Sequence, residues 1–111
     1  GHLECVRLLQ QAGAAVNHSL HDGFTPLIMA CQKGHVDIVR LLLKAGAAVK
    51  QAEKQGGTPL LMACQQGHVD IVRLLLEAGA AVDQAKQNGA TPLRIACHQG
   101  HLEVAKLLSS Y

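Results

Sequence analysis

The chain has 111 residues, of which 49% are hydrophobic, 16% charged and 2% aromatic, and its formal net charge is +2. This apolar share is too high for a disordered chain, and the scarcity of aromatic residues favours a core of closely packed helices over an aromatic-rich sheet. We expect a soluble protein without nucleic-acid or membrane partners, because the sequence shows no basic stripe, no apolar run of roughly 18–20 residues and no signal-peptide pattern.

The sequence repeats itself with a period of 33 residues. Residues 25–57 and 58–90 are identical at 25 of 33 positions, while residues 1–16 and 91–111 match the second half and the beginning of the same unit. A period of about 20–50 residues is typical of stacked repeat proteins, in which a unit buries its apolar faces only against its neighbours. We therefore predict a single domain, divided into a partial repeat at 1–19, repeats at 20–52 and 53–85, and a C-terminal repeat at 86–111.

Each unit is predicted to begin with a short helix that follows a capping threonine. The threonines are Thr25, Thr58 and Thr91, and a proline follows each of them at the first helical position. Threonine accepts a hydrogen bond at a helix N-terminus, and proline is tolerated next to it because the N–H that it lacks would have no helical partner. A glycine suited to a helix end stops each helix, at Gly34, Gly67 and Gly100.

A second helix is predicted in each unit, at 36–44, 69–77 and 102–109. Apolar residues recur there at the spacing of one helical face, and in the first range they are Val36, Val39, Leu42 and Leu43. Two further glycines per unit stand where positive φ is needed, one after the second helix and one in a turn before the next threonine. They are Gly13, Gly46 and Gly79, followed by Gly23, Gly56 and Gly89.

Several short motifs recur in phase along the chain. They are Thr-Pro-Leu at 25–27, 58–60 and 91–93, Gly-His at 1–2, 34–35, 67–68 and 100–101, and Gly-Ala at 13–14, 46–47 and 79–80. Through these motifs the whole chain resembles the ankyrin repeat family. The resemblance implies an all-α fold, a solenoid of stacked antiparallel helix pairs with short turn or β-hairpin fingers projecting on one side.

The chain departs from the family pattern at a position that helps to tie the fingers to the helices. The family favours Asp five residues before the capping threonine, where this chain has Leu20, Glu53 and Lys86. We therefore expect fingers that are present but less tightly fixed than those of a consensus array.

The two ends of the repeat pattern differ from its middle. The first unit begins at its second helix, so Cys5, Leu8 and Leu9 would leave apolar surface exposed. This surface predicts possible end-to-end self-association through the N-terminal half repeat. At the other end Ser109 stands where Leu76 stands one unit earlier, which gives a partial polar cap.

A cysteine and a histidine recur four residues apart, first as Cys31 and His35. A zinc site needs about four converging ligands, but a glycine and a helix end separate these two residues, so they do not share one helix face. In the family the cysteine position holds a small buried residue and the histidine lies in the turn between helices. We therefore predict no metal, no reactive thiol and no disulfide scaffold, and a reduced protein of the cytoplasm or nucleus.

The sequence offers no Gly-rich phosphate loop, no paired catalytic carboxylates and no Ser–His–Asp arrangement, so neither an enzyme nor a cofactor is predicted. The resemblance implies instead a non-catalytic scaffold that binds a protein or peptide partner along its finger tips and the exposed edge of each first helix. Carried over by position, the partner-binding residues are Ser19, His21, Asp22, Phe24, Gln32, Lys33, Lys54, Gln55, Gln65, Gln66, Gln87, Asn88, Arg94, His98 and Gln99.

The near-identity of two units leaves a second interpretation open. An engineered or consensus-like ankyrin-repeat protein with no native partner would show such self-similarity. The loss of residues that the family usually keeps, such as the Asp replaced by Lys86, argues against this interpretation, because a designer would retain them.

Overall fold

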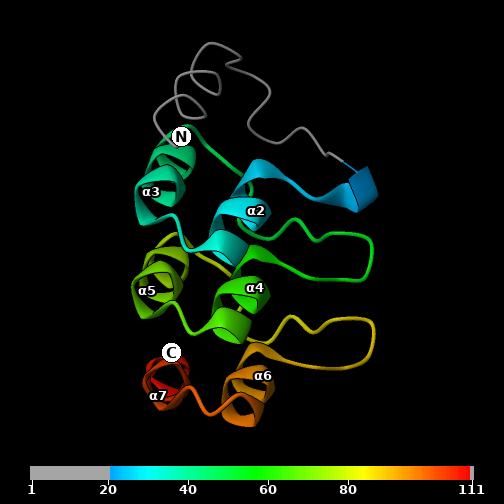
Figure 1. Cartoon of the computed structure of the whole chain (residues 1–111), viewed down its shortest axis with the longest axis vertical. Coiled ribbons are helices and arrows are strands. Elements are labelled where there is room, and N and C mark those ends of the chain that lie inside the picture. The colour runs from blue at the N-terminus through cyan, green and yellow to red at the C-terminus, as the bar shows by residue number, and fades with distance from the viewer. Residues whose placement is uncertain (1–20, 111) are drawn as a thin grey trace.

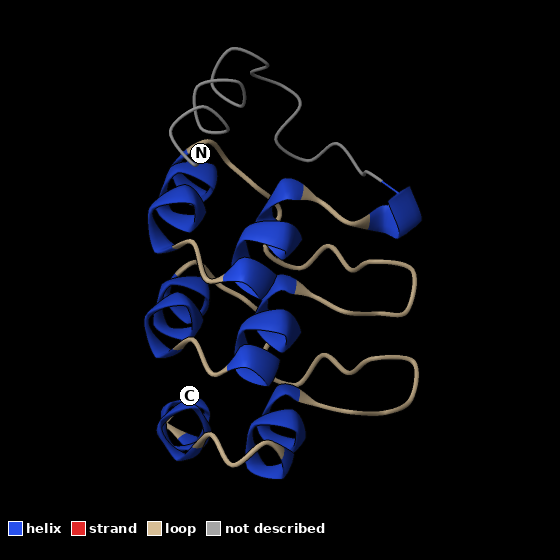
Figure 2. Ribbon diagram, viewed as in Figure 1, coloured by secondary structure: helices blue, strands red, loops and turns tan. Residues whose placement is uncertain are grey.

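The computed structural model describes residues 21–110, which form helices joined by loops and contain no strand (Figure 2). A short 3-10 helix, η2 (His21–Gly23), precedes three pairs of α-helices. The pairs are α2 (Pro26–Lys33) with α3 (Val36–Lys44), α4 (Pro59–Gln66) with α5 (Val69–Glu77), and α6 (Pro92–His98) with α7 (Leu102–Ser109). The ranges predicted for the second helix of each pair are confirmed.

Threonine caps start the first helices, as the sequence predicts. The hydroxyl oxygens of Thr25, Thr58 and Thr91 accept hydrogen bonds from the backbone N–H three residues later, at 3.2, 3.2 and 3.3 Å. The helices α2 and α4 end at Gly34 and Gly67, both with left-handed backbone angles. The first helix of the third pair, α6, ends one residue sooner, with Gln99 as its C-cap. Gly100 follows Gln99 and also has a positive φ.

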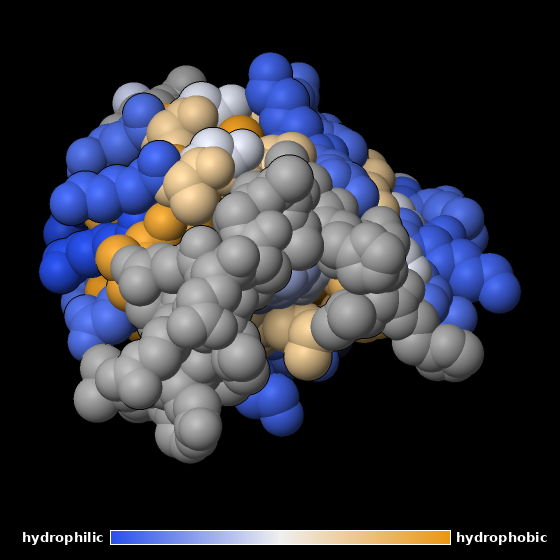
Figure 3. All heavy atoms as spheres, turned by 90° about the horizontal axis from the view of Figure 1, so that it is seen from above, coloured by the Kyte–Doolittle hydropathy of each residue, from blue (hydrophilic) through white to orange (hydrophobic). Residues whose placement is uncertain are grey.

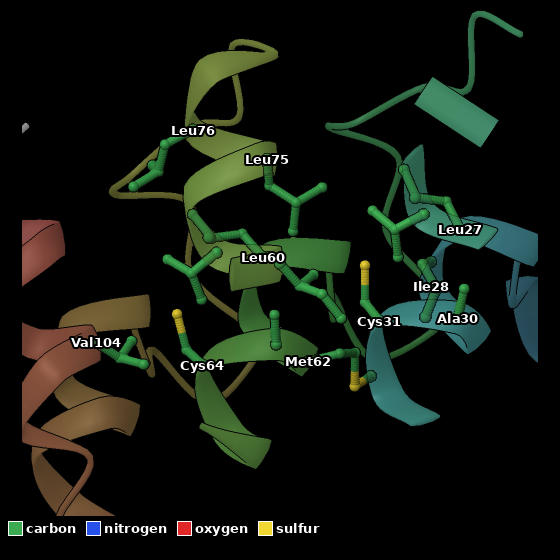
Figure 4. Close-up of a cluster of buried hydrophobic side chains, with 14 of the residues drawn as sticks. Leu27, Ile28, Ala30, Cys31, Leu60, Met62, Cys64, Leu75, Leu76 and Val104 are labelled. Carbon is green, nitrogen blue, oxygen red and sulfur yellow. The ribbon is translucent and has the colours of Figure 1, made fainter. Parts of the chain in front are cut away.

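The helix pairs stack in two columns. The helices α2, α4 and α6 contact one another in sequence, the helices α3, α5 and α7 form the second column, and each first helix packs on the second helix of its own pair (Figure 1). A face of each second helix supplies core residues, such as Ile71, Val72 and Leu75 of α5, which are fully buried. The apolar core therefore lies between the columns and runs through all three pairs, as Figure 4 shows for Cys31 of α2, Leu60 of α4 and Val104 of α7.

Burial is lower at the last pair than at the two pairs before it. Leu27 and Leu60, which hold the same position in α2 and α4, are 0% and 1% exposed, whereas the equivalent Leu93 is 41% exposed. The polar residues Arg94 and Ser109 replace apolar residues of the earlier units on this face. The resemblance implies a buried residue at the cysteine position, which the structure shows for Cys31 and Cys64 but not for Cys97, which is exposed.

A histidine ring of each later pair lies against a glycine of the pair before it. A Cβ atom added to Gly34 would lie 2.8 Å from Cε1 of His68, and one added to Gly67 would lie 2.7 Å from Nδ1 of His101. Real Cβ atoms essentially never approach other atoms so closely, so a residue with a side chain would displace the ring. These glycines therefore serve both the left-handed helix end and the stacking of neighbouring pairs.

Two long loops, 45–58 and 78–91, connect the pairs and project from the column of first helices, away from the second helices (Figure 1). Each loop closes on itself through backbone hydrogen bonds, such as the N–H of Glu53 to the oxygen of Gly57 at 2.9 Å. Each is also bonded to the preceding segment: the N–H of Lys54 donates to the oxygen of Asp22 at 2.8 Å, and that of Gln87 to the oxygen of Gln55 at 3.0 Å. The loops are thus held in register by main-chain atoms.

The expected loss of hydrogen bonds in the loops does not occur at Glu53. Its carboxylate is buried, and Oε1 accepts the backbone N–H groups of Gln55 at 2.9 Å and Gly57 at 2.7 Å. The longer Glu side chain therefore supplies an acceptor in place of the Asp that the family favours at this position. Lys86, at the same position of the next loop, cannot accept, and there Oδ1 of Asn88 takes the N–H of Ala90 at 3.0 Å instead.

Within residues 21–110, no helix has both the length and the apolar character that a membrane crossing requires.

Candidate functional site

The described residues predicted to bind a partner lie in or directly after η2, at the tips of the long loops and on the first helices. Ser19 lies outside the described residues, and only the backbone of His21 is described. The others are exposed, with the exception of Phe24, which is half-buried and packs against the core. In the view down the stack, hydrophilic side chains stand at the edge of the loops and also at the edge of the second helices (Figure 3). Exposure alone therefore does not distinguish the loop side from the outer face of the second helices. The hollows in the surface provide the distinction.

A hollow of about 280 Å³ lies where the second long loop meets the first helices, and we name it the C-terminal hollow. Its lining residues are Gln65, Lys86, Asn88, Ala90, Arg94, Ile95, His98 and Gln99. It brings together predicted residues from α4, from the loop and from α6. All its ionisable side chains are basic, since Lys86, Arg94 and His98 line it and no carboxylate does.

A second hollow, of about 480 Å³, lies at the tips of the loops, and we name it the N-terminal hollow. Its lining residues are Asp22, Phe24, Glu53, Lys54, Gln55 and Gln87. A smaller hollow of about 210 Å³, lined by Gln55, Lys86, Gln87 and Asn88, shares residues with both of the others. The three hollows therefore follow the line of the loops, whereas Gln32, Lys33 and Gln66 line none of them.

Comparison of the sequence with models of protein families gave one match. The model for ankyrin repeats (3 copies) matches residues 1–53 and 46–111. The chain belongs to the ankyrin repeat family. Comparison with curated proteins gave no match. Ankyrin repeats generally mediate protein–protein interactions, and the family is typically non-catalytic.

Two of the residues predicted to bind a partner of this ankyrin chain also hold the loops in place. Nε2 of Gln87 donates to the backbone oxygen of Lys54 at 2.9 Å, which links the second long loop to the first. Oδ1 of Asn88 is used within its own loop. Their remaining polar atoms, Oε1 of Gln87 and Nδ2 of Asn88, are the ones that a partner could engage.

Sequence reasoning missed Lys86 as a surface residue of the ankyrin array. The sequence indicates Lys86 only as a departure from the family's usual Asp, yet it lines two of the three hollows. The available signal was chemical, because a basic residue at a position that favours an acid changes the charge of the loop. Glu53, at the equivalent position of the first long loop, is instead buried and accepts a hydrogen bond from the backbone of its own loop.

The cysteines of the ankyrin core do not form a reactive site. Cys31 and Cys64 are fully buried, and burial raises the pKa of the Cys31 thiol far above its ordinary value and that of Cys64 to about 12. Because the thiolate is the nucleophile and the metal ligand, these two groups are inert near neutral pH. Among residues 21–110, no group of three or more His, Cys, Asp or Glu side chains is placed to hold a metal ion.

Proposed function

We propose that this ankyrin repeat chain is a non-catalytic scaffold that binds a protein or peptide partner through its loop side, defined as the tips of the long loops and the exposed parts of α2, α4 and α6. The observation that supports the proposal best is the line of three hollows along the loops, which places residues from separate repeats next to one another. Backbone hydrogen bonds between consecutive segments hold this side in one arrangement, which lowers the entropic cost of binding.

The proposal includes a continuous ankyrin solenoid whose long loops act as its fingers. The two columns of helices and the loop-to-loop hydrogen bonds support it. Phe24 and Arg94 are the proposed anchor residues, since aromatic and Arg side chains supply much of the binding energy in many interfaces. A cytoplasmic or nuclear location belongs to the same proposal, and the free thiols of Cys31 and Cys64 are compatible with a reducing compartment.

The experiment compares two variants that change exposed residues on opposite sides of the array. The loop-side variant combines Lys54→Ala, Gln55→Ala and Gln66→Ala, and the control variant combines Arg40→Ala and Arg73→Ala on α3 and α5; all five residues are exposed. Each immobilised protein is used to capture partners from cell extract, and circular dichroism verifies that each is folded. We expect the loop-side variant to lose proteins that the wild type and the control both retain. If both variants capture the same proteins as the wild type, the loop side is not the binding surface.

The engineered interpretation remains the second candidate because residues 25–57 and 58–90 are so similar. It predicts that neither the wild type nor either variant captures a specific partner. Self-association through residues 1–19 also stays a prediction, since these residues lie outside those that the structure describes. A sedimentation series over protein concentration tests it, and a monomer mass at every concentration would contradict it.

A further inference from the structure

We propose that the C-terminal hollow binds a carboxylate side chain in an acidic segment of the partner protein. This inference rests on the proposed function and names the chemistry that the loop side selects.

The ionisable side chains that line the C-terminal hollow are all basic. Lys86 comes from the loop, and Arg94 and His98 come from α6, so side chains of two separate elements converge there. The remaining polar lining is made of amides, including Gln65 and Gln99, which can donate N–H groups. A planar guanidinium beside an ammonium and amide donors matches a carboxylate, which accepts several hydrogen bonds and can take two from Arg at once.

Charge is distributed unevenly between the first helices and the second helices. Acidic and basic residues balance on the second helices α3, α5 and α7. The excess of positive charge among residues 21–110 therefore lies on the first helices, at Lys33 of α2 and Arg94 of α6, because the charges of η2 and the loops cancel. The N-terminal hollow does not share it, because Asp22 and Glu53 accompany Lys54 there. An acidic group is consequently favoured at one end of the loop side and not along all of it.

The C-terminal hollow is small compared with most ligand pockets. Pockets for whole small molecules and cofactors are typically about 300–1,000 Å³, and the C-terminal hollow lies just below this range at about 280 Å³. A hollow of this size has room for one side chain of a peptide. A nucleic acid is disfavoured, since it calls for basic residues along its path and aromatic platforms for its bases. The carboxylates of the N-terminal hollow would repel its phosphates.

The test uses three labelled hexapeptides, of six Glu, six Gln and six Lys residues, with both peptide ends blocked. Binding to the full chain is measured by fluorescence anisotropy near neutral pH, and amide NMR shifts locate the contact. We expect the Glu peptide to bind and the other two to bind at least about tenfold more weakly. The largest shifts should fall at Ala90, Ile95 and His98 around the hollow.

A pair of matched variants separates the hollow from general charge attraction. Lys86→Ala with Arg94→Ala removes two positive charges from the hollow, and Lys44→Ala with Arg73→Ala removes two from exposed positions of α3 and α5. We expect the first pair to weaken Glu-peptide binding about tenfold and the second to change it less than about twofold. Both variants keep the backbone hydrogen bonds of the loop, and circular dichroism verifies their folding.

Four results would overturn the inference: no binding of the Glu peptide, equal binding of the Gln peptide, equal loss in both variants, or tighter binding of a single-stranded oligonucleotide. Because the loop-side variant leaves Lys86 and Arg94 in place, failure here is distinguishable from failure of the proposed function. Partner capture that depends on the loop side, together with an indifferent Glu peptide, would reject the carboxylate and keep the scaffold.

Discussion

The imidazole of His101 lies directly over Gly67, a residue of the preceding repeat. Its Nε2–H donates to the backbone oxygen of Gln65 at 3.1 Å, so the ring both fills the space above the glycine and bonds to the end of α4. The His68 ring lies over Gly34 in the same way. The recurring Gly-His motif therefore joins neighbouring repeats: the histidine of one repeat needs the glycine of the repeat before.

Replacing Gly67 by Ala should destabilise the array more than the same change at Gly100. Both glycines have φ near 76°, so the backbone strain is alike, at about 1–2 kcal/mol. Only at Gly67 does the new Cβ meet the His101 ring, which should add about 1–3 kcal/mol, while nothing lies within 4 Å at Gly100. Denaturant unfolding of the two variants measures the difference, and equal losses would show that the ring moves aside without cost.

Glu53→Ala should cost about 2–3 kcal/mol of unfolding free energy. The change removes the acceptor for two backbone N–H groups, those of Gln55 and Gly57, in a partly or fully buried setting. Glu53→Asp should recover most of the loss, because the family commonly uses Asp at this position. Thermal unfolding monitored by circular dichroism compares the three proteins, and an Ala variant as stable as the wild type would mean that water replaces the carboxylate.

Thiol labelling should distinguish Cys97 from the other described cysteines. Cys97 is exposed, whereas Cys31 and Cys64 are fully buried, so a disulfide reagent should modify Cys97 in the native protein and the other two only after unfolding. A Cys5→Ser background removes the cysteine that lies outside the described residues. Rapid labelling of Cys64 at neutral pH would indicate local opening of the pair formed by α4 and α5.

Stability should fall at alkaline pH because of the buried thiols. The folded-state pKa of Cys64 is raised from an ordinary value of 9.0 to about 12, so the folded state holds this proton more tightly than the unfolded state. The resulting stability is fully present below about pH 9 and is lost as pH rises toward 12, by up to about 1.4 kcal/mol per pH unit. Cys64→Ala should flatten this slope in urea unfolding between pH 8 and 11, and an unchanged slope would assign the alkaline loss to other groups.

Local signals in the sequence predicted the helices and their ends, but they did not predict the contacts between repeats. The capping threonines and the positive-φ glycines act within a few residues, so their roles could be inferred from spacing alone. The resemblance placed His35 and its equivalents in a turn, but not against a glycine one repeat away. The exposure of Cys97 depends on which helices pack against α6, and the position of Lys86 in the hollow depends on how the loop meets α6. Neither relationship is encoded in a window of neighbouring residues.

The hydrogen bonds between consecutive loops have an evolutionary consequence. Because Lys54 and Gln87 join the preceding segments through their backbone N–H groups, their bonds to Asp22 and Gln55 do not depend on which side chains stand at these positions. Substitutions at tip positions other than Gln87 and Asn88, whose side chains also bond to the loops, can therefore alter the surface without removing these backbone bonds. Natural variation or laboratory grafting could change the ligand preference of this chain by exchanging tip residues while its framework stays constant.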